Sequence, residues 1–116
     1  MITTVDVETS WQKTDNGGYD PSPFHPDNIL VSVGINDEYY FTNHSERIDK
    51  GCFHKIQKIL DKTTLLVGHN IKFDLMWLLE SGFKYSGRVY DTMLGEYILN
   101  RGIRKSLTLE MCCRRR

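Results

Sequence analysis

The sequence has no apolar run approaching the roughly 20 residues that a membrane-spanning helix requires, and its N-terminus lacks the basic and apolar regions of a secretory signal. It contains only three cysteines, Cys52, Cys112 and Cys113, and no pair has the Cys-x-x-Cys spacing. Neither a disulfide framework nor a structural zinc site is therefore expected. These absences predict a protein outside the membrane, in a reducing compartment such as the cytoplasm.

The length of 116 residues suits a single domain, spanning residues 1–116 without a linker. The formal net charge is zero, but the charge is unevenly placed. Nine acidic residues precede residue 50 against two basic ones, whereas six basic residues follow residue 99 against one acid, Glu110. This division suits a protein that holds cations at one place and phosphates at another. A solvated basic tail would give the same pattern.

Hydrophobic periodicity predicts an α/β fold. Strands are expected at residues 2–7, 29–35, 38–42, 63–68 and 88–90, and helices at 45–60, 70–82, 92–100 and from 106 onward. Glycines and prolines make residues 11–28 a predicted loop. Three strands followed by alternating helices and strands predict a mixed sheet with helices packed on it.

Asp6 and Glu8 are separated by one residue in the first predicted strand, so both carboxylates leave the same face while Val5 and Val7 enter the core. Two such carboxylates repel each other unless a cation lies between them, and oxygen ligands suit Mg²⁺ or Mn²⁺. An ordinary exposed strand face would also explain this pair.

Two further aspartates follow predicted strands. Asp74 lies in the first turn of a predicted helix that Asn70 would cap, and Asp91 lies between a strand and a helix. Either could simply stabilise a helix N-terminus. Both could instead join a ligand site, since ligands often bind where the strands of an open sheet end.

The motifs around these residues resemble those of the DEDD (DnaQ-like) 3′-5′ exonucleases. Val5-Asp6-Val7-Glu8-Thr9 is similar to the first motif, and His69-Asn70-Ile71-Lys72-Phe73-Asp74 to the second. Residues 90–100 resemble the stretch that follows in the exonuclease domain of bacterial and phage family A DNA polymerases, and residues 106–109 the start of the next helix. The resemblance spans most of the chain and implies an RNase H-like fold that hydrolyses DNA from its 3′ end.

The resemblance also implies roles for individual residues. Asp6, Glu8 and Asp74 match the carboxylates that hold two Mg²⁺ or Mn²⁺ ions, with Asp6 bridging them. Thr9 and Asn70 match positions that shape the site and contact substrate, and Asp91 would support the site from outside the metal ligands. Trp11 would stack on or wedge a terminal base, unless it is a loop anchor buried against the sheet.

The third motif of the family, a Tyr or His four residues before an Asp, is absent from residues 92–116. Only Glu96 and Glu110 are acidic there, and neither has a Tyr or His four residues before it. The resemblance therefore predicts a C-terminally truncated domain, or half of a split gene, with weak or no activity by itself. Exposed apolar surface left by the truncation would favour a homo-oligomer.

Expected partners are a single-stranded or frayed 3′ end of DNA, and a polymerase domain or second chain that supplies the missing motif. A phage-encoded chain would act in the cytoplasm of its host. Two other interpretations remain open. The first is a non-catalytic module that keeps the fold to bind nucleic acid or a polymerase, and the second is an RNA-directed member of the same superfamily.

Overall fold

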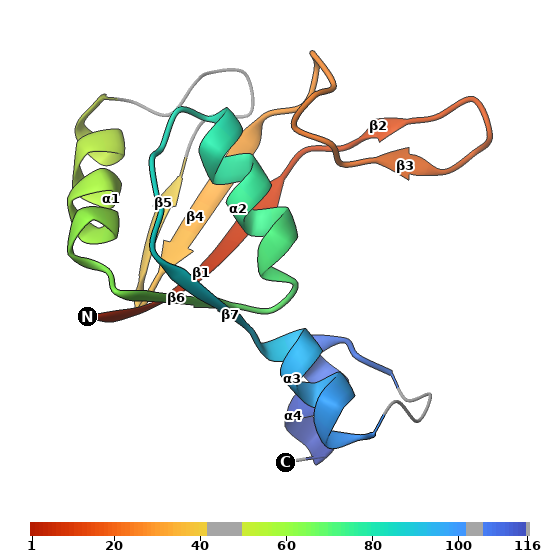
Figure 1. Ribbon diagram of the computed structural model, residues 1–116. Coiled ribbons are helices and arrows are strands. Elements are labelled where there is room, and N and C mark those ends of the chain that lie inside the picture. Colours follow the sequence, from red (N-terminus) through yellow and green to blue (C-terminus); the bar gives the residue numbers. More distant parts are fainter. Residues whose placement is uncertain (42–49, 102–105, 116) are drawn as a thin grey trace.

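The computed structural model describes residues 1–41, 50–101 and 106–115, and its centre is a five-stranded sheet (Figure 1). The strands are β1 (Ile2–Thr9), β4 (Leu30–Ile35), β5 (Glu38–Phe41), β6 (Leu65–Gly68) and β7 (Arg88–Asp91). They lie in the order β5-β4-β1-β6-β7. β4 runs antiparallel to β1 and β5, whereas β1, β6 and β7 are parallel. This confirms the predicted α/β fold with a mixed sheet, and it is consistent with an RNase H-like fold.

Strand β1 has the predicted alternation. Thr3, Val5 and Val7 are buried, whereas Asp6 and Glu8 are exposed. Side chains two residues apart leave the same face of a strand, so the valines enter the core and both carboxylates point to the opposite face.

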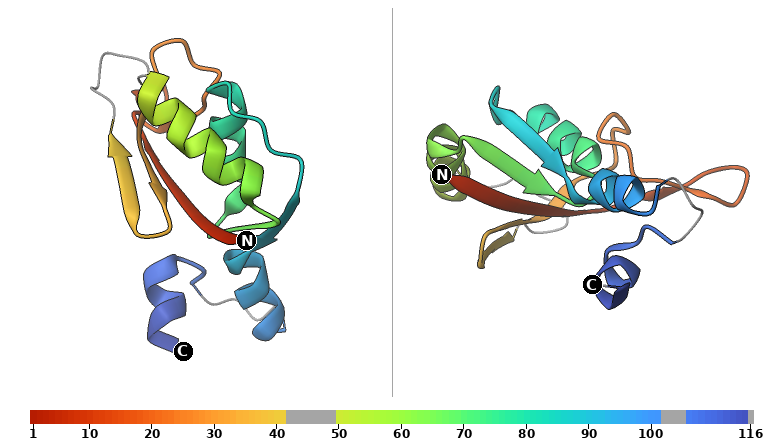
Figure 2. Two further views of the ribbon diagram at one scale, coloured as in Figure 1. Left: turned by 90° about the vertical axis from the view of Figure 1, so that its left-hand side faces the viewer. Right: turned by 60° about the horizontal axis from the view of Figure 1, so that its bottom comes forward.

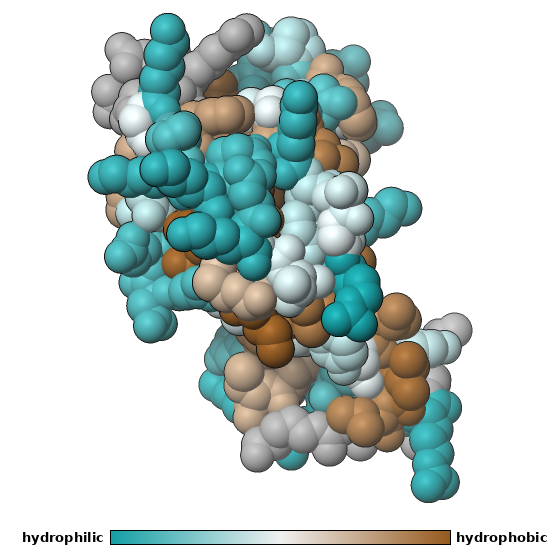
Figure 3. Space-filling model, turned by 60° about the vertical axis from the view of Figure 1, so that its left-hand side comes forward, coloured by the Kyte–Doolittle hydropathy of each residue, from teal (hydrophilic) through white to brown (hydrophobic). Residues whose placement is uncertain are grey.

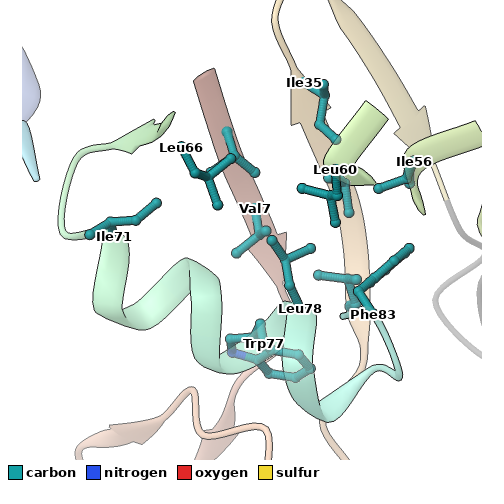
Figure 4. Packing of buried hydrophobic residues seen from close by; sticks show 12 residues of the cluster. Val7, Ile35, Ile56, Leu60, Leu66, Ile71, Trp77, Leu78 and Phe83 are labelled. Carbon is teal, nitrogen blue, oxygen red and sulfur yellow. The ribbon is translucent and has the colours of Figure 1, made fainter. Parts of the chain in front are cut away.

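Two helices, α1 (Lys50–Lys62) and α2 (Ile71–Glu80), cover the face of the sheet that carries the valines (Figure 2). Their buried residues pack with those of the central strands in one cluster (Figure 4). The members are Val5, Val7, Leu30, Val33, Ile35, Ile56, Leu60, Leu66, Ile71, Trp77, Leu78 and Phe83. This core fixes α2 over β1 and β6.

The last two helices, α3 (Thr92–Leu99) and α4 (Leu109–Arg115), form a pair beyond the end of β7, apart from α1 and α2 (Figures 1 and 2). Arg115 Nε donates to Glu96 Oε1 over 2.9 Å, and the Glu96 side chain is only 5% exposed. Arg115 Nη2 also donates to the Ser106 carbonyl over 2.6 Å. The first of these charge-assisted hydrogen bonds joins the two helices, and the second connects α4 to the segment that precedes it.

Helix α3 has an inverted surface pattern. Glu96 is the residue it buries, whereas its apolar residues Leu94, Tyr97, Ile98 and Leu99 are exposed, with Ile98 at 64% and Leu99 at 65%. Figure 3 shows apolar side chains gathered at the end of the molecule that α3 and α4 form. Exposed apolar surface of this kind favours association.

We expect the chain to self-associate through the exposed apolar face of α3. Ile98→Lys should shift the chain toward the monomer, because burying an unpaired charge in an interface costs free energy. Sedimentation velocity over a range of concentrations measures this shift. Leu79→Lys, on the exposed side of α2, is the matched control. A wild-type chain that stays monomeric at every concentration would contradict the expectation.

Some local expectations need correction. Residues 11–28 are not all loop, because β2 (Gln12–Lys13) and β3 (Tyr19–Asp20) pair as an antiparallel ribbon that projects from the body (Figure 1). Helix α4 begins at Leu109, and the Met111 N–H bonds Thr108 Oγ1 over 3.3 Å. Thr108 rather than Ser106 is therefore the cap, since a capping hydroxyl must reach a backbone N–H within the first turn.

The predicted helix start at residues 45–49 and the helix stop at Gly102 lie outside the described residues. Within the described ranges, no helix is long and apolar enough to cross a membrane.

Candidate active site

Asp74 occupies the edge of β1 that β6 leaves unpaired. β1 pairs with β6 only from Ile2 to Thr4, because β6 ends at Gly68 and the chain turns into α2. The Asp74 carboxylate receives a hydrogen bond from the Val7 backbone N–H. The first turn of α2 therefore supplies the acceptor that a longer β6 would have provided.

Gly68 makes this close approach of α2 to the sheet possible. A Cβ at this position would lie 2.6 Å from Ile71 Cδ1, 3.2 Å from the Val5 carbonyl oxygen and 3.3 Å from Asp74 Oδ2. A side chain here would therefore push α2, and the carboxylate it carries, away from β1.

The Asp74 carboxyl is buried and incompletely satisfied. The residue is 3% exposed, and Oδ2 has no hydrogen-bond partner among residues 1–41, 50–101 and 106–115. The pKa of Asp74 is raised from 3.8 to about 7, first by burial and then by the nearby Asp6 carboxylate, with a smaller contribution from Asp91 and against the lowering effect of the Val7 N–H. An unpaired carboxylate oxygen beside two other acids is costly in a structural role, and it is typical of a site that receives a proton or a cation.

Asp91 caps α3 and also connects the β6–α2 turn to the β7–α3 turn. Its Oδ1 accepts the backbone N–H groups of Met93 over 2.9 Å, Leu94 over 3.4 Å and Asn70 over 2.9 Å. The first two bonds are those of an N-cap. The third holds the β6–α2 turn against the β7–α3 turn.

Asn70 precedes α2 as expected, but its side chain makes no capping hydrogen bond. The residue is in the left-handed region, with φ 59° and ψ 52°, which Asn tolerates better than most residues. The expected position of Asn70 as the N-cap residue is therefore confirmed, whereas the expected capping by its side chain is not. Asn70 permits the sharp turn, and its N–H is held by Asp91.

We expect Asp91→Ala to destabilise the fold by about 1–2 kcal/mol, because it removes a helix cap and leaves the Asn70 N–H without its acceptor. Asp91→Asn keeps a side-chain oxygen and should cost clearly less. Urea denaturation followed by circular dichroism measures both. Equal losses for the two variants would show that the negative charge of Asp91, rather than its acceptor geometry, stabilises the turn.

Glu8 lies on the same face of β1 as Asp6 and is exposed. Within residues 1–41, 50–101 and 106–115, no group of three or more His, Cys, Asp or Glu side chains is close enough to hold a metal ion together. The structure therefore brings Asp6 and Asp91 near Asp74 but does not gather Asp6, Glu8 and Asp74 into one cluster. The three-carboxylate metal site remains a prediction.

The pairing of β1 with β4 becomes irregular after Glu8. The register between β1 and β4 shifts between Glu8 and Thr9, which is a bulge of the kind that often redirects side chains beside a site. Thr9 is half-buried there. Ser10 then ties the start of the ribbon to Ile29, donating its N–H to the Ile29 carbonyl and accepting the Ile29 N–H.

Trp11 is 54% exposed, so it is not an anchor buried against the sheet. Its ring meets that of Tyr19, 57% exposed, edge to face at a centroid distance of 4.1 Å. Trp11 directly precedes β2, and Tyr19 in β3 pairs with Lys13, so the pairing of the two strands brings the rings together. Sequence reasoning missed Tyr19, because only the pairing of the ribbon strands indicates that it lies beside Trp11.

His69 is a second residue without an assigned role in the sequence-based prediction. Its Nδ1 lies 2.9 Å from Thr92 Oγ1, and its Nε2 is hydrogen-bonded to the Leu107 carbonyl. Its position beside Asn70 in the second motif was the only sequence signal. The bonding partners are 23 and 38 residues away and could not be inferred from spacing.

A mixed sheet in this order, with acidic side chains on its first strand and on the helix after β6, is consistent with an α/β domain of the RNase H-like class. A family model described as 3′-5′ exonuclease, of the DNA polymerase A type, matches residues 18–112. The chain belongs to this 3′-5′ exonuclease family, whose members are typically metal-dependent.

The matched range contains Asp74 and Asp91 and begins after Asp6 and Glu8. A search of curated proteins found no match. The assignment of Glu8 to the site therefore depends on the first motif, and that of Asp6 depends on the same motif and on its position near Asp74.

Proposed function

We propose that this chain is a metal-dependent proofreading 3′-5′ exonuclease domain that hydrolyses DNA from its 3′ end, as part of a DNA polymerase. The observation that carries the proposal is the buried Asp74 carboxyl, whose Oδ2 lacks a partner in the part of the chain that the structure describes and which lies near Asp6 in a chain of this family. A module that only bound nucleic acid would gain nothing from gathering acids near a phosphate.

We assign Asp6, Glu8 and Asp74 as the residues that hold Mg²⁺ or Mn²⁺. Their oxygen donors suit hard divalent cations. A cation beside Asp74 would offset the burial and the repulsion from Asp6 that raise the pKa of this carboxyl, and it would give Oδ2 a partner. When bound, such ions stabilise charge on the phosphate and the leaving oxygen and lower the pKa of a bound water.

The other residues position the site and the substrate. Asp91 accepts the Asn70 N–H and so holds the turn that leads into α2, the helix on which Asp74 lies. Trp11 and Tyr19 offer exposed aromatic faces on which unpaired bases of a single-stranded or frayed 3′ end can stack, a contact that tolerates any base. Thr9 lies at the bulge between this aromatic pair and the carboxylates, and the exposed side chain of Asn70 is available to the substrate.

We expect slow 3′-5′ degradation of a 5′-labelled DNA primer with a 3′ mismatch in Mn²⁺, abolished by EDTA. Asp6→Asn should reduce the rate at least about 100-fold, since even residues that only support metal ligands contribute about 10–100-fold. Asp37→Asn, an identical change in the exposed β4–β5 turn, should leave the rate unchanged. Equal rates for wild type and Asp6→Asn would remove Asp6 from the mechanism.

A second candidate is a catalytically incomplete module that binds nucleic acid or a polymerase. It is favoured by the missing third motif and by the lack of a three-ligand group in the described part of the chain. Binding of a fluorescent single-stranded primer by a chain that degrades nothing, with or without Mn²⁺, would favour this candidate. Loss of that binding in Trp11→Ala would then identify the aromatic pair as its contact surface.

A further inference from the structure

His69 bridges three parts of the chain from a half-buried position at the end of β6. One ring nitrogen contacts Thr92, the first residue of α3, and the other contacts the carbonyl of Leu107, just before α4. Both nitrogens are therefore engaged, each by a different element.

The chemistry of these partners fixes the arrangement of protons. A carbonyl oxygen can only accept, so Nε2 must carry the proton and donate to Leu107. In the neutral ring Nδ1 then accepts from the Thr92 hydroxyl over 2.9 Å. The Gly68 carbonyl, 3.4 Å from the same hydroxyl, is a longer alternative for that proton.

The bond from His69 to Thr92 is one of two connections between the β6–α2 turn and the β7–α3 turn. The second connection is made by the backbone. The N–H of the next residue, Asn70, donates to Asp91 Oδ1. Together these bonds clamp the β6–α2 turn to the β7–α3 turn. Asp74 lies in the first turn of α2, immediately after the clamped segment.

The contact with Leu107 extends this clamp to the α3–α4 pair. Inside the pair, Arg115 joins α4 to Glu96 of α3 and to Ser106. The pair lies beyond the sheet and follows β7 directly (Figure 1). The bond from His69 therefore gives it a second attachment, at the segment that precedes α4.

We propose that His69 is a positioning residue that docks the α3–α4 pair onto the β6–α2 turn, which precedes Asp74, so that docking of α4 and the geometry of the carboxylate site are coupled. The coupling to the site depends on the proposed function, whereas the docking does not. Such coupling is reciprocal. If docking of α4 raises the affinity for an ion at the carboxylates by a given factor, the bound ion should raise the equilibrium constant of docking by the same factor.

Cysteines already in the chain can report on this coupling. Cys112 is buried in α4, Cys113 beside it is exposed, and Cys52 is half-buried in α1. In a Cys113→Ser chain, alkylation followed by peptide mass spectrometry gives separate rates for Cys112, which reports docking of α4, and Cys52, which reports the body of the domain. The variants are His69→Ala, the conservative His69→Gln, whose amide can still donate to Leu107, and His54→Ala on the exposed side of α1 as the matched control.

We expect His69→Ala to raise the alkylation rate of Cys112 about tenfold with the rate of Cys52 unchanged, since losing a partly buried hydrogen bond shifts a local opening by about that factor. His69→Gln should recover part of the protection, and His54→Ala should match the parent chain. The affinity for Mn²⁺, measured by electron paramagnetic resonance, should fall about tenfold in His69→Ala. Saturating Mn²⁺ should slow alkylation of Cys112 in the parent chain but not in His69→Ala.

Unchanged alkylation of Cys112 in His69→Ala would overturn the proposal, as would equal acceleration at Cys52, which indicates general destabilisation. Faster alkylation of Cys112 with unchanged Mn²⁺ affinity would overturn the coupling and leave His69 a local structural residue. A parent chain that binds no Mn²⁺ would instead overturn the proposed function and the coupling with it, while the Cys112 rates would still decide whether His69 docks α4.

Discussion

Replacing Asp74 by Asn is expected to stabilise the metal-free chain at pH 8 and to stabilise it clearly less at pH 5. The pKa of Asp74 is raised from 3.8 to about 7, so the folded state binds this proton more tightly than the unfolded state. Its contribution to stability is complete below about pH 4 and is lost as the pH rises through 7. The full change in the pKa of Asp74 corresponds to about 4 kcal/mol of folding free energy. Because Asp6, which contributes to this change, is exposed to solvent and therefore screened, we expect a stabilisation of roughly 1–3 kcal/mol.

Thermal denaturation in EDTA at pH 5 and pH 8 measures this difference, with Asp37→Asn as the matched exposed control. For a chain of this size, about 1 kcal/mol corresponds to a change in Tm of about 4 °C. Adding Mn²⁺ at pH 8 should then raise the Tm of the wild type and not that of Asp74→Asn, since an ion that binds only the folded state stabilises it. A destabilised Asp74→Asn at pH 8 would mean that its carboxylate is satisfied by the fold itself.

Trp77→Ala is expected to cost about 3–5 kcal/mol, because it removes a large buried side chain from the core between α2 and the sheet (Figure 4). The indole also donates its N–H to the Pro21 carbonyl over 3.0 Å, which attaches the segment following the β2–β3 ribbon to α2. Asn28 holds the same segment by donating to the Asp20 and Ser22 carbonyls. We therefore expect the ribbon that carries Trp11 to lose its fixed position as well.

Trp77→Phe separates the two contributions. It keeps most of the apolar volume and loses the hydrogen bond, so a loss of about 1–2 kcal/mol is expected. Leu79→Ala, on the exposed side of the same helix, should change stability little. Urea denaturation followed by circular dichroism measures the energies, and fluorescence of the remaining Trp11 reports on the ribbon. Trp77→Ala and Leu79→Ala of equal stability would contradict the packing shown in Figure 4.

The proposed function and the position of His69 together suggest how the chain controls its own site. The carboxylates lie on β1 and at the start of α2, whereas the residues that hold α2 in place come from the two turns that end the parallel strands. Positioning residues of this kind do not contact the substrate themselves, but they restrict the positions that a carboxylate can take. Changes in α3 or α4 can therefore reach the site without any residue of these helices entering it.

The sequence alone determined the elements with strong local signals. The alternation of valine and acid in β1 fixed which side chains share a face, and the turn residues and apolar runs fixed the approximate ends of most strands and helices. The motifs around Asp6, Glu8 and Asp74 were sufficient to indicate the exonuclease family, which the family comparison confirmed. All of these signals depend on residues within a few positions of one another.

Only the tertiary structure decided the environment of those residues. Asp74 is buried, its Oδ2 has no hydrogen-bond partner among the described residues, and its pKa is raised by this burial and by the nearby Asp6, none of which can be read from the local sequence. The contact between Trp11 and Tyr19, the bonds of His69 and the outward apolar face of α3 likewise join segments distant in sequence or depend on what packs beside them. Periodicity predicts which face of an element is apolar, but the neighbours that the fold provides decide whether that face is buried.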